Sequence, residues 1–254
     1  MSVSSVSAAS ASASMQIASG NRIPSAATDA AGQAIASRLE SQVSGNTQGA
    51  ANTADMRNLV NTAEGGMSAI SENLQRLNEL SLQAQNGLLT NQDRAIIQNE
   101  VSQILQSIES ISQQTQWGGR NLLDGQAQNL NTASFPDGTG PQVSIPEMSL
   151  ASLGLEGFDV TSAGFDPGAV SNAMDTVAAA RAGLGATANA MGSIISNNET
   201  AAINQAAARS RIADTDIARA STELSQEQAA QQYQIYAQER AQEGQLQTLR
   251  LFNA

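Results

Sequence analysis

The sequence predicts a mainly α-helical protein: a long antiparallel helical bundle or coiled coil with a small β-hairpin element, plus paired N- and C-terminal helices. In three long segments the apolar residues recur at alternating steps of four and three, which places them along one side of a helix. Only 3% of the 254 residues are aromatic although 41% are hydrophobic, so small aliphatic side chains would form the core. Four of the five prolines fall within residues 126–167, where we expect one or two β-hairpins.

Composition excludes several classes of function. The chain contains no Cys, His or Lys, so all twelve basic residues are Arg. Thiolate metal sites, histidine bases and lysine Schiff bases are therefore excluded, and we expect neither a cofactor nor enzymatic activity. A net charge of −11 argues against nucleic acid and anionic membranes as partners. No segment reaches the roughly 20 apolar residues of a membrane span, and the N-terminus lacks the features of a Sec signal peptide.

The N-terminal part predicts a short helix, a connector and a long helix. Residues 3–19 are rich in Ser and Ala, with a narrow apolar stripe that indicates either a helix in need of a partner or a flexible tail. Residues 20–28 contain Gly, Asn, Pro and Ser and predict an extended connector. Asp29 then precedes a helix from about Ala30 to Gln85, which the following Asn-Gly pair ends.

The middle of the chain predicts a second helix and a β region. The second helix begins near residue 91 and continues to about Gln114, and it carries the most regular apolar repeat. Trp117 and the two glycines after it end this helix, and residues 121–125 predict a turn. Alternating residues at 142–145 and 158–161 predict strands.

Two further helices complete the prediction. A third helix spans about 169–211, with Arg181 interrupting its apolar repeat, and a Gln-rich last helix spans about 216–251. Because a chain that leaves and returns can pair its ends, we expect the terminal helices to lie together and the other three to form the bundle. We predict that its core contains Met67, Ile70, Leu74, Leu77, Ile97, Val101, Ile104, Ile108, Ile111, Val177, Leu184, Met191 and Ile195.

Several segments resemble conserved parts of bacterial flagellins. They are residues 19–23 (SGNRI) with 29–36 (DAAGQAIA), residues 62–65 (TAEG) with 74–80 (LQRLNEL), residues 115–125 (TQWGGRNLLDG) and residues 209–216 (RSRIADTD). Each segment alone is a weak match, but together they occur in the family's order and spacing. The chain therefore resembles a short bacterial flagellin over about residues 15–254.

This resemblance implies a structural subunit of the flagellar filament that assembles with itself into a helical tube for motility. It further implies export by the flagellar type III system, an export chaperone on the C-terminal helix, contacts with the filament cap and hook-associated proteins, and an extracellular location in the flagellum. Residues 1–19 with 217–254 would form the inner terminal-helix domain. Residues 20–29 and 209–216 would be connectors, and residues 30–208 the helical-bundle domain.

The resemblance also implies two sets of functional residues. In the first set, Gln75, Arg76, Leu80 and Glu100 match positions that contact neighbouring subunits along the filament axis and the flagellin-sensing Toll-like receptor. The alternative is that Leu80 packs at the edge of the bundle while Arg76 and Glu100 form an exposed pair between helices. In the second set, two adjacent connectors would form the joint between the domains through Arg22, Asp29, Arg209, Arg211 and Asp214.

Other functions remain as alternatives. A hook–filament junction protein or minor flagellar protein would fit the same fold, although such proteins tend to carry Pro after the first connector, where this chain has Ala30. A soluble adhesin would need an added domain, and a carboxylate hydrolase would need a recognisable catalytic pair. The chain also departs from the family: its N-terminal helix is shorter than usual, and Trp117 stands where Phe is common.

Overall fold

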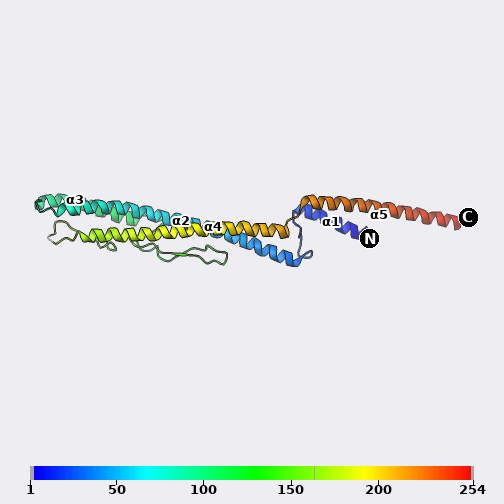
Figure 1. The fold of residues 1–254 in the computed structure, drawn as a ribbon, viewed down its shortest axis with the longest axis horizontal. Coiled ribbons are helices and arrows are strands. Elements are labelled where there is room, and N and C mark those ends of the chain that lie inside the picture. The colour runs from blue at the N-terminus through cyan, green and yellow to red at the C-terminus, as the bar shows by residue number, and fades with distance from the viewer. Residues whose placement is uncertain (1–2, 163, 253–254) are drawn as a thin grey trace. The chain divides into compact units, whose positions relative to one another are not determined.

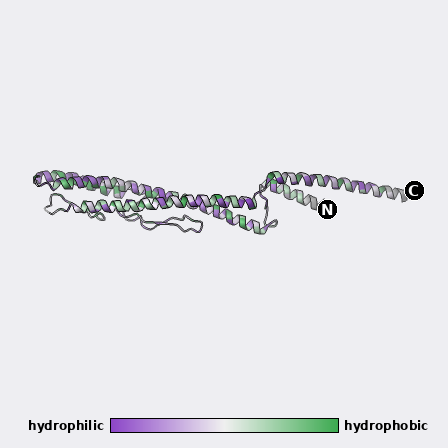
Figure 2. Ribbon diagram, in the orientation of Figure 1, coloured by the Kyte–Doolittle hydropathy of each residue, from purple (hydrophilic) through white to green (hydrophobic). Residues whose placement is uncertain are grey.

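The computed structural model describes residues 3–162 and 164–252, and it confirms the predicted fold class: mainly α-helical, with two small antiparallel strand pairs. The helices in this part of the chain are α1 (Val3–Ser19), α2 (Ala30–Ala84), α3 (Asn91–Gln114), α4 (Gly168–Ala213) and α5 (Ile217–Phe252) (Figure 1). Each begins and ends within two residues of its prediction. Figure 2 shows polar and apolar residues interspersed along the long helices, and no described helix is long and apolar enough to cross a membrane.

The chain forms two compact units. One contains Met1–Val43 with Ala202–Ala254, and the other contains Ser44–Ala201. The first turns of α2 and the last turns of α4 therefore belong with the terminal helices, whereas most of the bundle lies in the second unit.

In the second unit, α3 and α4 both run antiparallel to α2. A short turn joins α2 to α3. Glu64 of α2 pairs with Arg181 of α4, whereas Gly49, earlier in α2, lies against Asn198, later in α4. The apolar sides of the three helices meet in one continuous core, which also takes in side chains from the β region.

The apolar side of α2 is the centre of this core. Met67, Ile70, Leu74 and Leu77 are completely buried, and Leu80 is only 2% exposed. Removing one such side chain from water contributes roughly 1.5–3 kcal/mol. A stripe of five large side chains is therefore a major source of stability for this unit.

A capping box begins α3. Thr90 Oγ1 accepts a hydrogen bond from the N–H of Asp93 at 3.3 Å, and the Asp93 carboxylate accepts one from the N–H of Thr90 at 2.9 Å. The Thr90 hydroxyl also donates to this carboxylate, and that bond, followed by the backbone bond, lowers the pKa of Asp93. The box satisfies donors that the first turn leaves open, so the helix begins at Asn91.

A β-hairpin with a two-residue loop follows α3, where the sequence predicted only a helix end and a turn. Strand β1 (Gln116–Trp117) pairs with β2 (Arg120–Asn121), and Gly118 and Gly119 connect them with φ of +58° and +82°. Two successive positive φ angles match the right-handed twist of a hairpin. The signal for this hairpin in the sequence is the Gly-Gly pair between Trp117 and Arg120, which also fits a simple helix end because it follows α3 directly.

Two strands were expected in the β-hairpin region, at 142–145 and 158–161. The structure confirms the first of them. Strand β3 (Leu130–Asn131) pairs with β4 (Gln142–Val143). The prediction of a strand at 158–161 is wrong, because this segment forms turns. The Asp159 carboxylate accepts hydrogen bonds from both the N–H and the hydroxyl of Thr161, and the Phe158 ring packs edge-on against Phe165. Such local side-chain bonds compete with a strand ladder.

In the first unit, α1 packs along α5. Ala13 of α1 and Ala220 of α5 are buried, and Gln231 Nε2 donates to Ser10 Oγ at 2.9 Å. Val3 and Val6 of the predicted stripe lie outside the residues whose side chains are described. Because the buried side chains here are mostly alanines, this pair of helices has a much smaller apolar core than the bundle.

Candidate functional site

The predicted contact residues lie where α2 and α3 run side by side. Arg76 of α2 donates to Glu100 Oε1 of α3 through Nε at 2.9 Å and through Nη2 at 2.7 Å. Its third nitrogen, Nη1, donates to Glu79 Oε2 on the next turn of α2 at 2.9 Å. The guanidinium therefore joins two carboxylates into one cluster, and all three side chains are about half exposed or more.

This cluster keeps its cation protonated. The hydrogen bond to Glu100 and then that to Glu79 raise the pKa of Arg76, which favours its charged form. The cluster carries one positive and two negative charges. It therefore presents both hydrogen-bond donors and acceptors to a partner at the surface.

The other two predicted contact residues differ from each other. Gln75 is exposed beside Arg76. Leu80, by contrast, is buried, because it continues the apolar stripe of Leu74 and Leu77. Its side chain is part of the bundle core, which matches the alternative reading of this position.

Three large apolar side chains lie exposed on α2, on α3 and in the turn that joins them. Leu82 follows Gln75 by seven residues on α2 and is 56% exposed, and Ile96 precedes Glu100 by one turn on α3 and is 64% exposed. Leu88, in the turn between the helices, is 90% exposed. We call Gln75, Arg76, Glu79, Leu82, Leu88, Ile96 and Glu100 the hairpin surface. An exposed combination of leucines, isoleucine and an ionic cluster is typical of a protein contact.

The two predicted connectors lie side by side in the first unit. Asn21 and Asp214 form an antiparallel bridge, and the N–H of Arg22 donates to the Ala213 carbonyl at 2.7 Å. The Arg22 side chain donates through Nε to the Ile212 carbonyl at 3.0 Å. Arg22 thereby satisfies a carbonyl that the end of α4 leaves open.

The remaining connector residues act at the helix ends. The Asp29 carboxylate accepts a hydrogen bond from the N–H of Gly32 at 2.8 Å and so caps α2. Arg209 pairs with Glu40 at 2.6 Å. Arg211 lies in the last turn of α4, where a positive charge complements the helix dipole, and no described residue forms an ion pair with it.

The structure buries eleven of the thirteen predicted core residues: Met67, Ile70, Leu74, Leu77, Ile97, Val101, Ile104, Ile108, Val177, Leu184 and Met191. Ile111 and Ile195 are half-buried. Both lie towards the ends of their apolar stripes, where fewer neighbours cover them.

Sequence reasoning missed two polar contacts between segments of the bundle. Arg181, which interrupts the apolar repeat of α4, donates to Glu64 Oε1 at 2.8 Å. In addition, Asn198 donates to the carbonyl of Ser134, and Thr53 lies 2.8 Å from the Ser134 hydroxyl. A charged residue in an apolar repeat was the signal for the first contact. The second contact joins residues 64 and 81 positions apart and left no local signal.

The described residues include no group of three carboxylates placed to hold a metal ion. The hollows on the bundle are open ones. The hollow over Met56 and Leu59 is lined by amides, a hydroxyl, a carboxylate and the Trp117 ring, and its neighbour also includes Arg120. The clearest functional geometry is therefore that of contact surfaces.

Known proteins share both the sequence and the fold. Residues 1–128 match the bacterial flagellin N-terminal helical region, and residues 168–252 match the bacterial flagellin C-terminal helical region. The phase 1 flagellin of Salmonella naestved and the flagellin of Salmonella derby are each 41% identical over 149 residues. These matches cover 59% of this chain but only 30% of each relative, so the chain matches less than a third of their length.

Two solved structures are similar to the chain. A crystal structure of Bacillus cereus flagellin is 22% identical and covers 58% of this chain and 88% of its own, with a TM-score of 0.49. A structure from Vibrio parahaemolyticus, described as a flagellar hook-associated protein, is 18% identical and covers 74% of this chain and all of its own, with a TM-score of 0.61. At this identity the second likeness shows a shared fold alone.

Proposed function

The chain belongs to the bacterial flagellin family, and we propose on this basis that it is a non-catalytic structural subunit that polymerises into a flagellar filament. Membership of the flagellin family supports the class of protein, a structural subunit of a flagellar filament. The surfaces of the two units support polymerisation as the way in which this chain works.

The exposed apolar side chains of the terminal helices carry this proposal. Met15 on α1 and five residues of α5 are between 50% and 76% exposed: Ile217, Tyr233, Ile235, Tyr236 and Leu246. The α1–α5 pair buries chiefly small residues, so these larger side chains contribute little in an isolated chain. Neighbouring subunits that cover them would supply the missing apolar burial and make the order of both helices depend on assembly.

The hairpin surface is the proposed contact between subunits along the filament axis. Arg76 and Glu100 offer charged donors and acceptors, and Leu82, Leu88 and Ile96 offer exposed apolar area. The same surface is the proposed site for a Toll-like receptor, with Arg76, Glu100 and Gln75 as its contacts. Leu80 would act there only indirectly, by holding α2 in the bundle.

We also propose which part of the filament subunit each segment of the chain forms. Residues 1–19 with 217–254 form the inner filament core, residues 20–29 and 209–216 the connectors, and residues 30–208, including the β-hairpin region 126–167, the bundle. Export through the flagellar type III channel would deliver the subunit outside the cell to the filament cap. The exposed Tyr233 and Leu246 make α5 a suitable segment for an export chaperone.

A junction or minor flagellar protein is the second candidate. The fold likeness to the Vibrio parahaemolyticus structure is compatible with it. The sequence after Asp29, Ala-Ala-Gly, favours the filament subunit, because junction proteins tend to carry Pro at this point.

Seeded polymerisation tests the proposal. Purified full-length protein, mixed with filament fragments, should form tubes visible by electron microscopy. A variant carrying Tyr233→Gln, Ile235→Gln and Leu246→Gln should keep the helicity of the bundle but fail to polymerise, because Gln preserves helix propensity while it removes apolar area.

Phe135→Gln is the matched control, since Phe135 is 41% exposed in a loop of the other unit. It should polymerise as the unaltered chain does. A chain that stays monomeric with intact termini would overturn the filament proposal. Normal assembly of the triple variant would show that α5 is not the contact that drives it.

A further inference from the structure

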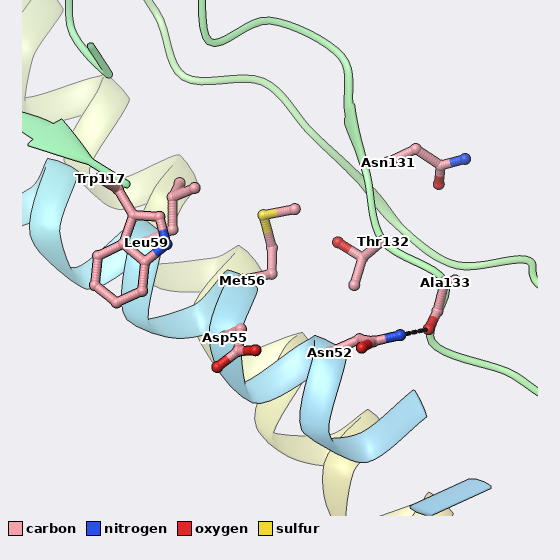
Figure 3. Close-up of a pocket in the computed structure, with 8 residues that line it drawn as sticks. All are labelled: Asn52, Asp55, Met56, Leu59, Trp117, Asn131, Thr132 and Ala133. Carbon is pink, nitrogen blue, oxygen red and sulfur yellow. Dashed lines mark hydrogen bonds between the residues drawn. The ribbon is translucent and has the colours of Figure 1, made fainter. Parts of the chain in front are cut away.

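A hollow on the bundle, away from the hairpin surface, has a distinctive lining (Figure 3). It lies between α2, strand β1 and the segment that contains β3, and its volume is about 340 Å³. Figure 3 shows Trp117 at one end and Asn131 at the other, with Asp55 and Asn52 on α2 along one side. A second hollow of about 530 Å³, which shares Met56 with the first, continues along the β region to Arg120. Both volumes fall within the range of small-molecule sites.

The floor of the hollow contains a polar group without a partner. Thr132 is only 4% exposed, and its Oγ1 forms no hydrogen bond with any described residue. In Figure 3 this oxygen points towards Met56, across the hollow. A buried hydroxyl that makes no hydrogen bond costs free energy, which a ligand oxygen would recover. Met56 can uncover it, because a thioether side chain has several rotatable bonds.

The rim combines a flat ring with hydrogen-bonding groups. The indole of Trp117 is 39% exposed, and the face of such a ring is electron-rich. Asp55 and Asn131 are exposed, and neither side chain forms a hydrogen bond or ion pair with the described residues. Asn52 is held in place because it donates to the Ala133 carbonyl at 2.9 Å. The rim therefore combines one positioned amide with two side chains whose polar groups can bond to a ligand.

The charges select the class of ligand. Asp55 and Arg120 cancel each other along the two hollows, and the whole chain carries a net charge of −11. Nucleotides and acidic polymers are therefore repelled. A neutral ring with C–H groups on its face and hydroxyls at its edge matches an indole face beside a carboxylate and an amide.

We propose that this hollow binds a neutral pyranose unit of a carbohydrate. The sugar face stacks on Trp117, its hydroxyls donate to the Asp55 carboxylate, and one of its oxygens accepts the hydrogen bond that Thr132 lacks. The subunit would then hold neutral glycans, a role that goes beyond filament formation and that a monomer can display.

Trp117 is the only tryptophan of the chain, so its fluorescence reports on the hollow directly. Full-length monomer is titrated with maltose, cellobiose, lactose and N,N′-diacetylchitobiose. At least one should give a saturable change with a Kd of about 1 mM or below. Sorbitol, which has hydroxyls but no ring face, should give none.

Asp55→Asn keeps the shape of the hollow and should weaken binding at least about tenfold. Asp175→Asn, the same change at an exposed position of α4, should leave binding unaltered. Thr132→Val should weaken binding without lowering the melting temperature, because it removes an unpartnered hydroxyl. Loss of binding without loss of stability separates a ligand role from a structural one.

Three results would overturn the proposal. The first is no saturable response to any of the four disaccharides, and the second is an equal response in Asp55→Asn. The third is a Trp117 signal that changes only on polymerisation, which would assign the hollow to a second copy of the chain. Because the titration uses monomer, failure here leaves the filament proposal untouched, and failure to polymerise leaves this one untouched.

Discussion

Gly49 of α2 lies so close to the carbonyl oxygen of Ser134 that a methyl group on Gly49 would overlap with it. The same oxygen accepts a hydrogen bond from Asn198 of α4 at 2.6 Å, and Thr53, one turn along α2, lies 2.8 Å from the Ser134 hydroxyl. Buried polar contacts therefore hold the loop after β3 against two helices. Gly49 leaves room for this loop because it has no side chain.

Gly49→Ala should destabilise the second unit. The added methyl must displace the backbone of Ser134, and overpacking of this kind typically lowers the free energy of unfolding by about 1–3 kcal/mol. Gly65→Ala, the same change in the same helix, meets no atom within 4 Å and should raise that free energy by roughly 0.5–1 kcal/mol. Urea unfolding followed by circular dichroism measures both. Effects of the same sign would contradict the close approach at Gly49.

Met67→Ala should be one of the costly changes in the bundle. Met67 is completely buried, so its truncation leaves a cavity and should lower the free energy of unfolding by about 2–5 kcal/mol. Leu82→Ala removes a side chain that is 56% exposed on the same helix and should change stability by about 0.5 kcal/mol or less. Equal losses in thermal melts would show that Leu82 is covered in the monomer.

The capping box of α3 should make part of the stability depend on pH. Because hydrogen bonds from Thr90 lower the pKa of Asp93 in the folded state, this carboxylate stabilises the fold above its ordinary pKa of 3.8, and the contribution declines as the pH falls below that value. Asp93→Ala should therefore reduce the loss of stability on acidification. Melting temperatures measured from neutral to acidic pH test this.

The other partner of the capping box can be tested at neutral pH. Thr90→Ala removes the hydroxyl that both accepts from and donates to Asp93, and should cost about 1 kcal/mol of stability. Slower hydrogen exchange in the first turn of α3 after this change would contradict the cap.

Arg76→Glu should impair filament assembly while the monomer stays folded. The change places three carboxylates together, but the site is exposed, so the melting temperature should fall only slightly. The double variant Arg76→Glu with Glu100→Arg restores an ion pair within the monomer but reverses both charges presented to a neighbour. Seeded assembly monitored by light scattering should remain impaired in both variants. Normal assembly of the double variant would mean that only the internal pair matters.

The predictions made from the sequence succeeded where the signal was local. The repeats at Met67–Leu77 and Ile97–Ile108 identify helices, and Asp29 marks where α2 begins. They failed at 158–161, where alternating residues suggested a strand, because the Asp159 carboxylate bonds to Thr161 and folds the backbone into a turn.

By itself the sequence determined the helices, their apolar sides and the resemblance to flagellins, since these depend on spacing within a few turns. Only the tertiary structure decided that Leu80 faces the core rather than a partner, that Arg181 pairs with Glu64, and that Gly49 receives the backbone of Ser134. Each of these depends on which distant segment packs against a given helix face. That choice is made by the burial of the whole core, and no short stretch of sequence contains it.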